Sequence, residues 1–392
     1  MKPENKPLPW GTLTGIRPSK VAEKLLISGE SAGAVLKTLK KKYFVLPDRA
    51  ALCLETAQTA LRFKESLTPK DIALYIGIPF CPTRCAYCSF VSNSVERSFS
   101  LTDSFTDILI QEIDTISRLA QEHGLRIITV YIGGGTPTAL PDEPLKAIMT
   151  AVKQSFDLSG LREYTVEAGR PDTVTAEKLE IITGLGANRI CINPQSMSAE
   201  VLTAIGRKHS PDDVYNAVKL VRETNAVLNM DIIAGLPSDT TCTFKQTLDS
   251  VMLLAPENIT VHTLSLKKGS RIMLENTAIP SGTEVGEMLD YASERLRESG
   301  YIPYYLYRQK YISGGFENTG WSLEGNEGIY NICMMDELCT VVALGGGGVT
   351  KHVTADGRIE RIFNAKYPRE YILMTEKIIE KVGRLREYAI SI

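Results

Sequence analysis

Three cysteines lie close together in this sequence, at Cys81, Cys85 and Cys88, directly after an apolar run at residues 72–78. Their spacing, C-x3-C-x2-C, places three thiols on one short loop. Three thiolates suit three corners of a cubane 4Fe-4S cluster and leave the fourth iron without a protein ligand. An iron of this kind is open to a small molecule, so we expect a reactive metal centre at this loop.

Two other uses of these cysteines stay open. A closed zinc site takes four Cys or His ligands, and a C-x2-C pair forms a redox dithiol in some proteins. No histidine lies within 30 residues of Cys88, so a zinc site would need a distant ligand. The other cysteines are scattered, and we interpret them as buried free thiols that act as small apolar side chains: Cys53, Cys191, Cys242, Cys333 and Cys339.

Length and composition indicate a soluble globular protein. With 392 residues, 43% of them hydrophobic, the chain has material for one large α/β domain with appendages or for two domains. A net charge of -2 offers no basic field, so no nucleic-acid partner is expected. No run of 18 apolar residues occurs and residues 1–10 do not resemble a signal peptide, which favours a cytoplasmic protein without membrane association.

The order of apolar segments predicts an α/β fold. Helical spacing at residues 17–28, 30–42 and 48–66 predicts a short N-terminal helical segment over residues 1–68. Beyond it, strands predicted at residues 72–78, 127–133, 163–168, 189–193, 229–233 and 260–266 alternate with helices at 103–122, 143–156, 176–185, 199–205, 212–224 and 244–254. Six β-α steps in a row indicate a parallel sheet wrapped by helices, with its chemistry at the carboxyl ends of the strands.

The remainder of the chain is less regular. Residues 69–275 form the predicted core, and residues 276–392 are predicted as a C-terminal α+β domain. This part contains helices at 282–299 and 368–382, a Tyr-rich stretch at 301–311 and a Gly/Asn-rich stretch at 314–331.

Residues that could bind a ligand stand at the predicted strand ends. A glycine run, Gly133 to Gly135 before Thr136, lets backbone groups approach a ligand such as an ammonium, although such a run also makes tight turns. Asp231 on the fifth strand suits ribose hydroxyls, and Arg207 suits a carboxylate through its two-pronged donor geometry. Singly, each has an equally good structural role, but their register with six strands argues for one site that also includes Glu167 and Gln195.

These motifs resemble those of radical S-adenosylmethionine (SAM) enzymes. That superfamily has C-x3-C-x-aromatic-C, here with Tyr87 at the aromatic position, and G-G-G-T-P is similar to its methionine-binding motif. The stretches Y-I-G-I-P-F-C-P-T-R-C-A-Y-C, V-E-A, N-P-Q-S, I-G-R-K-H and D-I-I-A-G-L-P resemble the oxygen-independent coproporphyrinogen III oxidase (dehydrogenase) family and its haem-chaperone relatives, from about residue 71 to the end. Residues 10–20 and 304–311 resemble its HemZ-type branch.

The resemblance implies a partial (β/α)6 TIM-like radical SAM barrel and assigns roles within it. The cluster would be held by Cys81, Cys85 and Cys88. One or two SAM molecules would bind, with cofactor contacts at Tyr87, Gly134, Gly135, Thr136, Glu167, Gln195, Arg207, Asp231, Leu264 and Val349. Tyr75 and Glu167 match positions near the reacting centre or a second SAM. The glycine run before Val349 would equally well form only a tight loop.

The implied activity is reductive cleavage of SAM to a 5'-deoxyadenosyl radical, with an electron from a flavodoxin- or ferredoxin-type donor. The radical would start oxidative decarboxylation of coproporphyrinogen III propionates to the vinyl groups of protoporphyrinogen IX, in anaerobic haem biosynthesis. Cationic hosts for the propionates would come from Arg17, Lys20, Arg308, Lys310 and Lys351, each of which could instead be a solvated surface residue. The sequence does not fix the oligomeric state.

Departures from the family pattern keep alternatives open. Gly77 stands where the family has a histidine, which weakens the case for decarboxylation. The chaperones' H-N-x-x-Y-W is not reproduced, the nearest stretch being E-N-T-G-W at residues 317–321, which counts against haem delivery. The alternatives are a haem chaperone without turnover, or another radical SAM reaction such as methylation, cyclopropanation or haem ring opening. HemZ-type proteins have additional sequence before residue 10, so the chain is expected to be shortened there.

Overall fold

The computed structural model of this chain describes residues 8–15, 17–88, 93–94, 99–267, 269–354, 357–373 and 375–390. Within these residues an eleven-stranded sheet has the order β13-β12-β11-β1-β4-β5-β6-β7-β8-β10-β9. Its centre consists of six strands that pair in parallel and in chain order: β1 (Asp71–Ile78), β4 (Arg126–Gly134), β5 (Glu163–Glu167), β6 (Arg189–Gln195), β7 (Val227–Ala234) and β8 (Asn258–Thr263). The predicted parallel α/β core is therefore confirmed.

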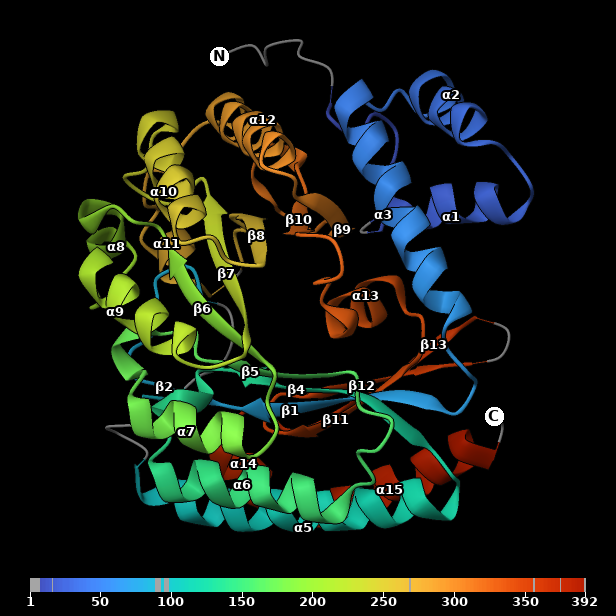
Figure 1. The fold of residues 1–392 in the computed structure, drawn as a ribbon, viewed down its shortest axis with the longest axis vertical. Coiled ribbons are helices and arrows are strands. Elements are labelled where there is room, and N and C mark those ends of the chain that lie inside the picture. Colours follow the sequence, from blue (N-terminus) through green and yellow to red (C-terminus); the bar gives the residue numbers. More distant parts are fainter. Residues whose placement is uncertain are drawn as a thin grey trace.

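Helices cover the outer side of the curved sheet (Figure 1). They are α5 (Thr102–Glu122), α6 (Asp142–Ser155), α7 (Ala176–Gly184), α8 (Ala199–Ala204), α9 (Pro211–Arg222), α10 (Thr241–Leu253) and α12 (Gly282–Glu298). Local sequence fixes where several of them begin. Ser210 and Ser281, for example, each form a capping box with an acidic residue three positions later, which pairs backbone N–H groups that the helix leaves free. Of the helices in the described ranges, none is long and apolar enough to cross a membrane.

The C-terminal part extends this same sheet at both edges. On one side β11 (Thr340–Gly345) pairs in parallel with β1, followed by antiparallel β12 (Val349–Val353) and β13 (Ile359–Phe363). On the other side β10 (Asn318–Ser322) pairs antiparallel with β8, and β9 (Ile302–Tyr307) pairs with β10. Residues 276–392 thus supply the pairing that both edges of the parallel core would otherwise lack. The boundary predicted at residue 275 stays a prediction.

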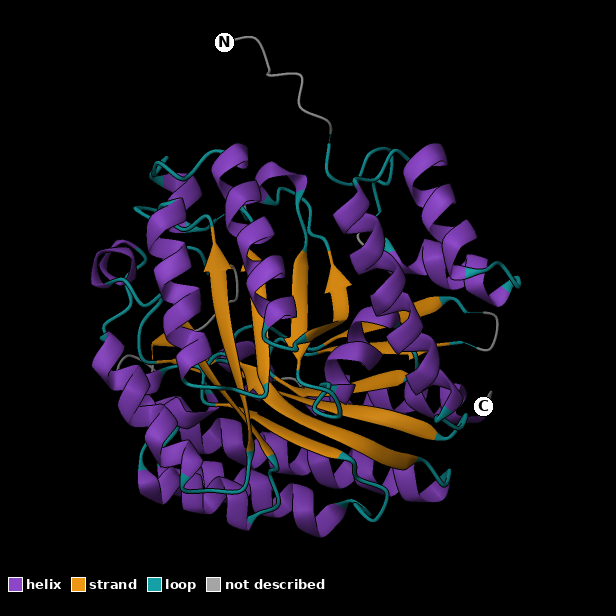
Figure 2. Ribbon diagram, turned by 45° about the horizontal axis from the view of Figure 1, so that its top comes forward, coloured by secondary structure: helices purple, strands orange, loops and turns teal. Residues whose placement is uncertain are grey.

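The N-terminal helices lie on one side of the molecule (Figure 2), and the last of them packs against β9 while the other two pack on that helix. They are α1 (Ser19–Ile27), α2 (Ala32–Lys42) and α3 (Pro47–Glu65), in agreement with the predicted helical segment. Trp10, Val35, Leu39 and Cys53 share a buried apolar cluster with Leu306 of β9. This cluster fixes the helical segment on the sheet.

One helix, α13 (Ile329–Asp336), lies on the inner side of the curved sheet (Figure 1), and we call it the plug helix. Its first backbone N–H groups, of Ile329 and Tyr330, donate to the Glu163 carboxylate at 2.7 and 3.2 Å. The last carbonyls, of Met334, Met335 and Asp336, accept from Lys351, Arg17 and Lys20 respectively. Both helix ends, which lack partners within the helix, are therefore paired with charge of the favourable sign.

These contacts concern one prediction. Arg17, Lys20 and Lys351 were considered as hosts for propionates, but each cation is engaged with the end of the plug helix. Arg308 is also engaged, since its guanidinium donates to the carbonyls of Leu13 at 2.6 Å and Gly315 at 3.0 Å. These four residues bind backbone carbonyls, and their assignment to propionates stays a prediction.

Replacing Glu163 with alanine is expected to destabilise the fold by about 3–5 kcal/mol, because it leaves the two helix N–H groups buried without their acceptor and the buried Arg189 without its carboxylate. Glu163 is only 4% exposed. The free energy of unfolding, from denaturant titration, measures the effect. The exposed Glu180 of α7 is a control, and E180A is expected to change stability by less than about 0.5 kcal/mol. Equal stabilities for the two variants would contradict the anchoring role.

Candidate functional site

The cysteine loop follows β1 at the carboxyl end of the parallel strands. Cys81 ends the short strand β2 (Phe80–Cys81), and Cys85 and Cys88 follow it. The Ala86 N–H donates to the Ile205 carbonyl at 2.9 Å, which fixes the loop to the chain after α8. None of the three thiols forms a disulfide, and Cys85 is 8% exposed while the other two are half-buried. The loop therefore offers three thiols that form no disulfide, beside the mouth of the barrel.

The three cysteines open onto one cavity of about 150 Å³. Ten of the residues predicted for the site line this cavity: Cys81, Cys85, Cys88, Tyr87, Gly134, Gly135, Thr136, Glu167, Gln195 and Arg207. They come from four different strand ends and from the chain after α8. The prediction that these motifs meet is supported by this shared lining.

The glycine run lets the end of β4 cross directly over the cysteine loop. Gly135 donates to the Ile78 carbonyl and Thr136 donates to the Phe80 carbonyl, both at 2.7 Å. A Cβ atom at Gly135 would lie 2.3 Å from the Phe80 oxygen, so no side chain fits there. Gly134 has φ +105°, a conformation that glycine adopts without strain. The run thus brings Thr136 Oγ1 to 3.5 Å from Cys81 Sγ.

Arg207 crosses the floor of the cavity. Its Nη1 donates to the carbonyls of Gly169 at 2.8 Å and Asn193 at 3.2 Å, and its Nη2 donates to the Tyr87 hydroxyl at 3.0 Å. Burial opposes the positive charge, but the interactions with Tyr87 and Cys85 outweigh it, so the pKa of Arg207 is raised. Arg207 therefore places a permanent positive charge in the wall of the cavity.

Three residues of the lining carry buried polar atoms without a partner. These atoms are Asn193 Oδ1, Gln195 Oε1 and Arg207 Nε. Gln195 also has φ +66°, a strained conformation for a residue with a side chain. Unpaired buried polar groups are costly, so this wall suits a ligand with hydroxyl, amine and carboxylate groups. The residues present therefore fit SAM.

Glu167 ends β5 at the inner side of the cavity. The Tyr131 hydroxyl donates to Glu167 Oε1 at 2.5 Å. Burial raises the pKa of the Glu167 carboxyl to about 7, although the bonds from Tyr131 and from the Gly134 backbone act in the opposite direction. Glu167 therefore changes charge near neutral pH.

The raised pKa predicts a pH dependence of stability. Between the ordinary pKa of 4.5 and about 7 the folded chain binds more protons at Glu167 than the unfolded chain. Its contribution to stability is therefore greatest below pH 4.5 and is lost as the pH rises to about 7. The thermal midpoint of cluster-free E167Q should accordingly fall less between pH 5 and pH 8 than that of the wild type. Parallel pH profiles for E167Q and the wild type would contradict the raised pKa.

Four predicted residues lie outside the cavity lining. Tyr75 packs beneath Gly134, where its hydroxyl would be 3.1 Å from a Cβ at that glycine. Leu264 lies in an apolar cluster with Ala86 that supports the cysteine loop. Val349 begins β12 and is half-buried. The fourth, Asp231, lies deeper in the barrel.

Asp231 accepts from Asn229 Nδ2 at 2.8 Å and pairs with His262 Nε2 at 3.5 Å. Burial alone would raise the pKa of Asp231, but the bonds from His262, Asn229 and Thr260 outweigh burial and lower it. Asp231 is therefore held as a carboxylate. The Asp231 side chain points to the inside of the barrel. A ligand whose ribose contacts Asp231 must therefore reach below Gln195.

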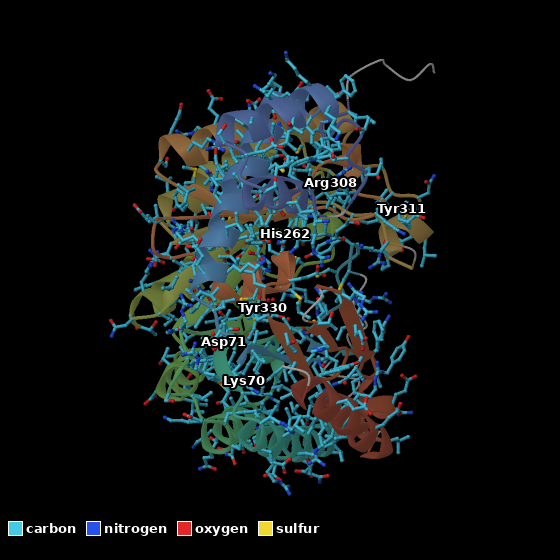
Figure 3. All side chains as sticks on the ribbon, turned by 90° about the vertical axis from the view of Figure 1, so that its right-hand side faces the viewer. Lys70, Asp71, His262, Arg308, Tyr311 and Tyr330 are labelled. Carbon is cyan, nitrogen blue, oxygen red and sulfur yellow. The ribbon has the colours of Figure 1, made fainter. Side chains whose placement is uncertain are left out.

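Aromatic rings line the inside of the barrel below the cavity. Tyr131 stacks on Tyr330 of the plug helix with ring centroids 4.4 Å apart, and Tyr75 stacks beside both at 6.2 and 6.1 Å. Figure 3 shows His262 and Tyr330 between the upper and lower halves of the molecule, with Arg308 above them. The plug helix and these stacked tyrosines thus cover the inside of the barrel beneath the cavity.

Sequence reasoning missed several residues of the site. Arg170 lines the cavity and bonds Asp172 and Thr83, and Asn193 faces Arg207. Asn193 lies in the N-P-Q-S motif and Arg170 directly follows V-E-A-G, so position relative to the motifs was the available signal. Tyr131 alternates with Gly133 on β4, which places both on the inner face.

The donor set fits a cluster with an open iron. Neither a histidine nor a fourth cysteine occurs among the described residues that line the cavity. Within the described ranges, no group of three or more His, Cys, Asp and Glu side chains is arranged to hold a single metal ion. Three thiols on one short loop suit three irons of a cluster, whereas a closed zinc site needs a fourth ligand.

Comparisons with known proteins agree with this site. The family model of the radical SAM superfamily matches residues 75–251, and the chain is a radical SAM protein. It is 40% identical over 369 residues to the oxygen-independent coproporphyrinogen-III oxidase-like protein HemZ of Bacillus subtilis (strain 168), with 92% of this chain and 74% of that protein covered. The chain therefore belongs to the HemZ family of coproporphyrinogen-III oxidase-like proteins within that superfamily.

More distant relatives have different names. The haem chaperone HemW of Escherichia coli (strain K12) is 26% identical over 302 residues, which covers 77% of this chain and 75% of HemW. Among solved structures, coproporphyrinogen III oxidase (HemN) from Escherichia coli, described as a radical SAM enzyme, matches with a TM-score of 0.63 at 20% identity. That match covers 84% of this chain and 72% of HemN, and it confirms the fold. Membership of the radical SAM superfamily implies a 4Fe-4S cluster and SAM.

Proposed function

We propose that this protein is a radical SAM enzyme that cleaves SAM reductively and oxidatively decarboxylates the propionates of coproporphyrinogen III. The observation that supports it most is the cavity in which the three cysteine thiols meet a glycine strand end, Arg207 and the unpaired polar atoms of Asn193 and Gln195. The similarity to HemZ supports a tetrapyrrole as the substrate class.

Each group of residues in the site has a separate proposed role. A bound 4Fe-4S cluster and SAM would supply one-electron chemistry, with the electron from a flavodoxin- or ferredoxin-type donor. The cluster would be held by Cys81, Cys85 and Cys88. The amine and carboxylate end of SAM would be lined by Gly134, Gly135 and Thr136, and Gln195 and Arg207 would complete the wall of the SAM site. The stacked tyrosines and the plug helix would keep water from the reacting atoms.

Glu167 and Tyr131 are placed to hold a proton at the inner end of the cavity. Their hydrogen bond and the raised pKa of Glu167 allow the pair to gain or lose one proton near neutral pH. A second SAM, which the family positions of Tyr75, Glu167 and Val349 suggest, would lie in this inner region. We propose one SAM at the cavity and leave the inner region to that second SAM or to the substrate.

A haem chaperone is the second candidate, because HemW is similar over much of the chain. In the stretch nearest to the chaperones' H-N-x-x-Y-W, E-N-T-G-W, the first residue is Glu317, which is 3% exposed. Its carboxylate accepts from Trp10 Nε1 at 2.8 Å and pairs with Arg49 Nε at 3.2 Å. A buried carboxylate with two partners is a poor haem ligand, which favours the enzyme.

The two functions separate in one anaerobic experiment. The reconstituted protein is incubated with SAM, dithionite and coproporphyrinogen III, and 5'-deoxyadenosine and vinyl products are measured by mass spectrometry. Substrate-dependent deoxyadenosine together with loss of carbon dioxide is the expected result. Stoichiometric haem binding without SAM turnover would overturn the proposal in favour of the chaperone. A transferred carbon or an opened macrocycle would instead indicate methylation, cyclopropanation or ring opening.

A further inference from the structure

A turn of four glycines, Gly345 to Gly348, packs against the segment that leads to the first cysteine. The Gly346 N–H donates to the Gly77 carbonyl at 2.9 Å. A Cβ atom at Gly77 would lie 2.4 Å from the Gly346 oxygen, and one at Gly346 would lie 2.6 Å from the Pro79 ring. The turn thus occupies the place of any side chain at position 77, where the family pattern has histidine. Cys81 lies only two residues beyond Pro79.

The buried carboxylate of Glu112, on α5, holds this turn from the outer side of the sheet. Glu112 is 0% exposed. Its Oε2 accepts from the Gly345 N–H at 2.8 Å and from the Tyr371 hydroxyl at 2.5 Å. Its Oε1 accepts from Lys381 Nζ at 2.8 Å and from Asn364 Nδ2 at 3.3 Å. All four contacts come from residues far from Glu112 in the sequence.

The partners of Glu112 hold the turn as well. Asn364 Nδ2 donates to the Gly345 carbonyl at 2.8 Å, and the Asn364 N–H donates to the Gly348 carbonyl at 2.9 Å. Lys381 Nζ donates to the carbonyl of Ala343, which lies in the strand before the turn. Since the N–H groups of Gly345, Gly346 and Gly347 are all paired within the protein, the turn forms a rigid wall and not an open nest for an anion.

Stability alone does not account for a charge at this place. The side chains of Glu112 and Lys381 are 1% and 3% exposed, and burying two charges costs free energy that an apolar pair would not lose. What an apolar pair would not provide is an acceptor for the Gly345 N–H. The Glu112 carboxylate therefore fixes the backbone geometry of the glycine turn.

We propose that Glu112 is a positioning residue for the cofactor site. It fixes the glycine turn, the turn fixes Gly77 and Pro79, and these fix the origin of the cysteine loop. This inference rests on the proposed function, because it concerns how the chain holds the cluster and SAM in register. Glu112 acts only through the turn and touches neither group.

The test compares two double variants of the full chain. E112M/K381M removes the buried pair together and avoids an unpaired charge, but leaves the Gly345 N–H without its acceptor. E122M/R386M is the matched control, because Glu122 and Arg386 form an exposed 2.8 Å ion pair between the same helices, α5 and α15 (Thr375–Ile390), away from the turn. Thermal midpoints of both are measured first.

Hydrogen exchange then reports on the turn directly. In cluster-free E112M/K381M, amide protection in peptides covering residues 77–81 and 345–348 is expected to fall about tenfold or more, as the loss of one buried hydrogen bond to a charged group implies. In the reconstituted protein, the Kd of SAM, from the SAM-induced change of the cluster's electron paramagnetic resonance signal, is expected to rise by about the same factor. The control variant should match the wild type in both measurements.

Unchanged protection and unchanged SAM affinity in a stable E112M/K381M would overturn the inference. If that variant does not fold, E112Q replaces it, since the amide keeps the size of the side chain but is an uncharged and weaker acceptor for the Gly345 N–H. Protection and SAM affinity equal to the wild type in E112Q would equally overturn it. A wild-type protein that forms no cluster would refute the proposed function, whereas the exchange data on cluster-free protein would still decide the role of Glu112.

Discussion

Replacing Cys85 with serine is expected to abolish both cluster formation and cleavage of SAM. Cys85 is the most buried of the three cysteines in the loop, and it lies beside Tyr87 and Arg207. A hydroxyl is a poor ligand for cluster iron compared with a thiolate. Changes to outer partners of metal ligands already cost roughly 10–100-fold, so loss of a ligand should reduce deoxyadenosine formation to background.

The measurement uses anaerobically reconstituted protein. Iron and sulfide content and the visible absorption of the cluster report on assembly, and deoxyadenosine reports on turnover. Cys242 on α10 provides the matched control, because it is an exposed thiol outside the cysteine loop. C242S should assemble the cluster and cleave SAM like the wild type. Circular dichroism of C85S should remain native, since serine has nearly the volume of cysteine.

The opposite result would be equally informative. A C85S protein that keeps its brown chromophore would show that Cys85 is not a ligand. One tightly bound zinc ion per chain in the wild type, without iron or sulfide, would return the loop to the zinc interpretation that the sequence left open. Either outcome would remove the basis for the proposed SAM chemistry.

The parallel core could be read from the sequence because its strands are buried on both faces. Such strands appear as continuous apolar runs, and β1, with every residue but Tyr75 buried, illustrates this. The site followed from the core. Parallel strands end at one edge of the sheet, so Gly135, Glu167 and Gln195, from three successive strands, had to approach one another.

The partners of charged residues could not be read in the same way. Arg17, Lys20 and Lys351 are far apart in sequence, yet all three bind the last carbonyls of the plug helix. A sequence shows that a cation is present but not which carbonyl it meets. The assignment of these residues to propionates used charge alone and stays a prediction, whereas their contacts with the helix end came only from the structure.

The pairing of β11 with β1 was hidden for a related reason. The two strands are joined through Ile72 and Thr340, and no local pattern indicates a contact over such a separation.

The helix predicted at residues 368–382 is in fact two, α14 (Pro368–Ile372) and α15. Tyr371 and Lys381 would lie about 15 Å apart along one straight helix, but both contact Glu112, so the helix has to break between them.

Substituting alanine for Gly135 is expected to have the second large effect. The added Cβ atom would lie 2.3 Å from the Phe80 oxygen and 2.8 Å from the Ile78 oxygen, and both are backbone atoms that cannot turn aside. The end of β4 and the cysteine loop must therefore separate. Overpacking of this kind costs about 1–3 kcal/mol in stability, and a displacement of about 1 Å at a reacting centre costs about a hundredfold in rate.

The comparison with Gly33→Ala isolates this steric cause. Gly33 lies in α2 with no atom within 4 Å of the position of its Cβ, so alanine there should raise stability by about 0.5–1 kcal/mol and leave SAM cleavage unchanged. Denaturant unfolding and deoxyadenosine formation are measured for both variants. Because G135A retains all three thiols, its cluster content separates loss of assembly from loss of SAM binding. If G135A cleaves SAM at the wild-type rate, β4 and the cysteine loop are not held together in the working enzyme as they are here, and the glycine run has no part in seating SAM.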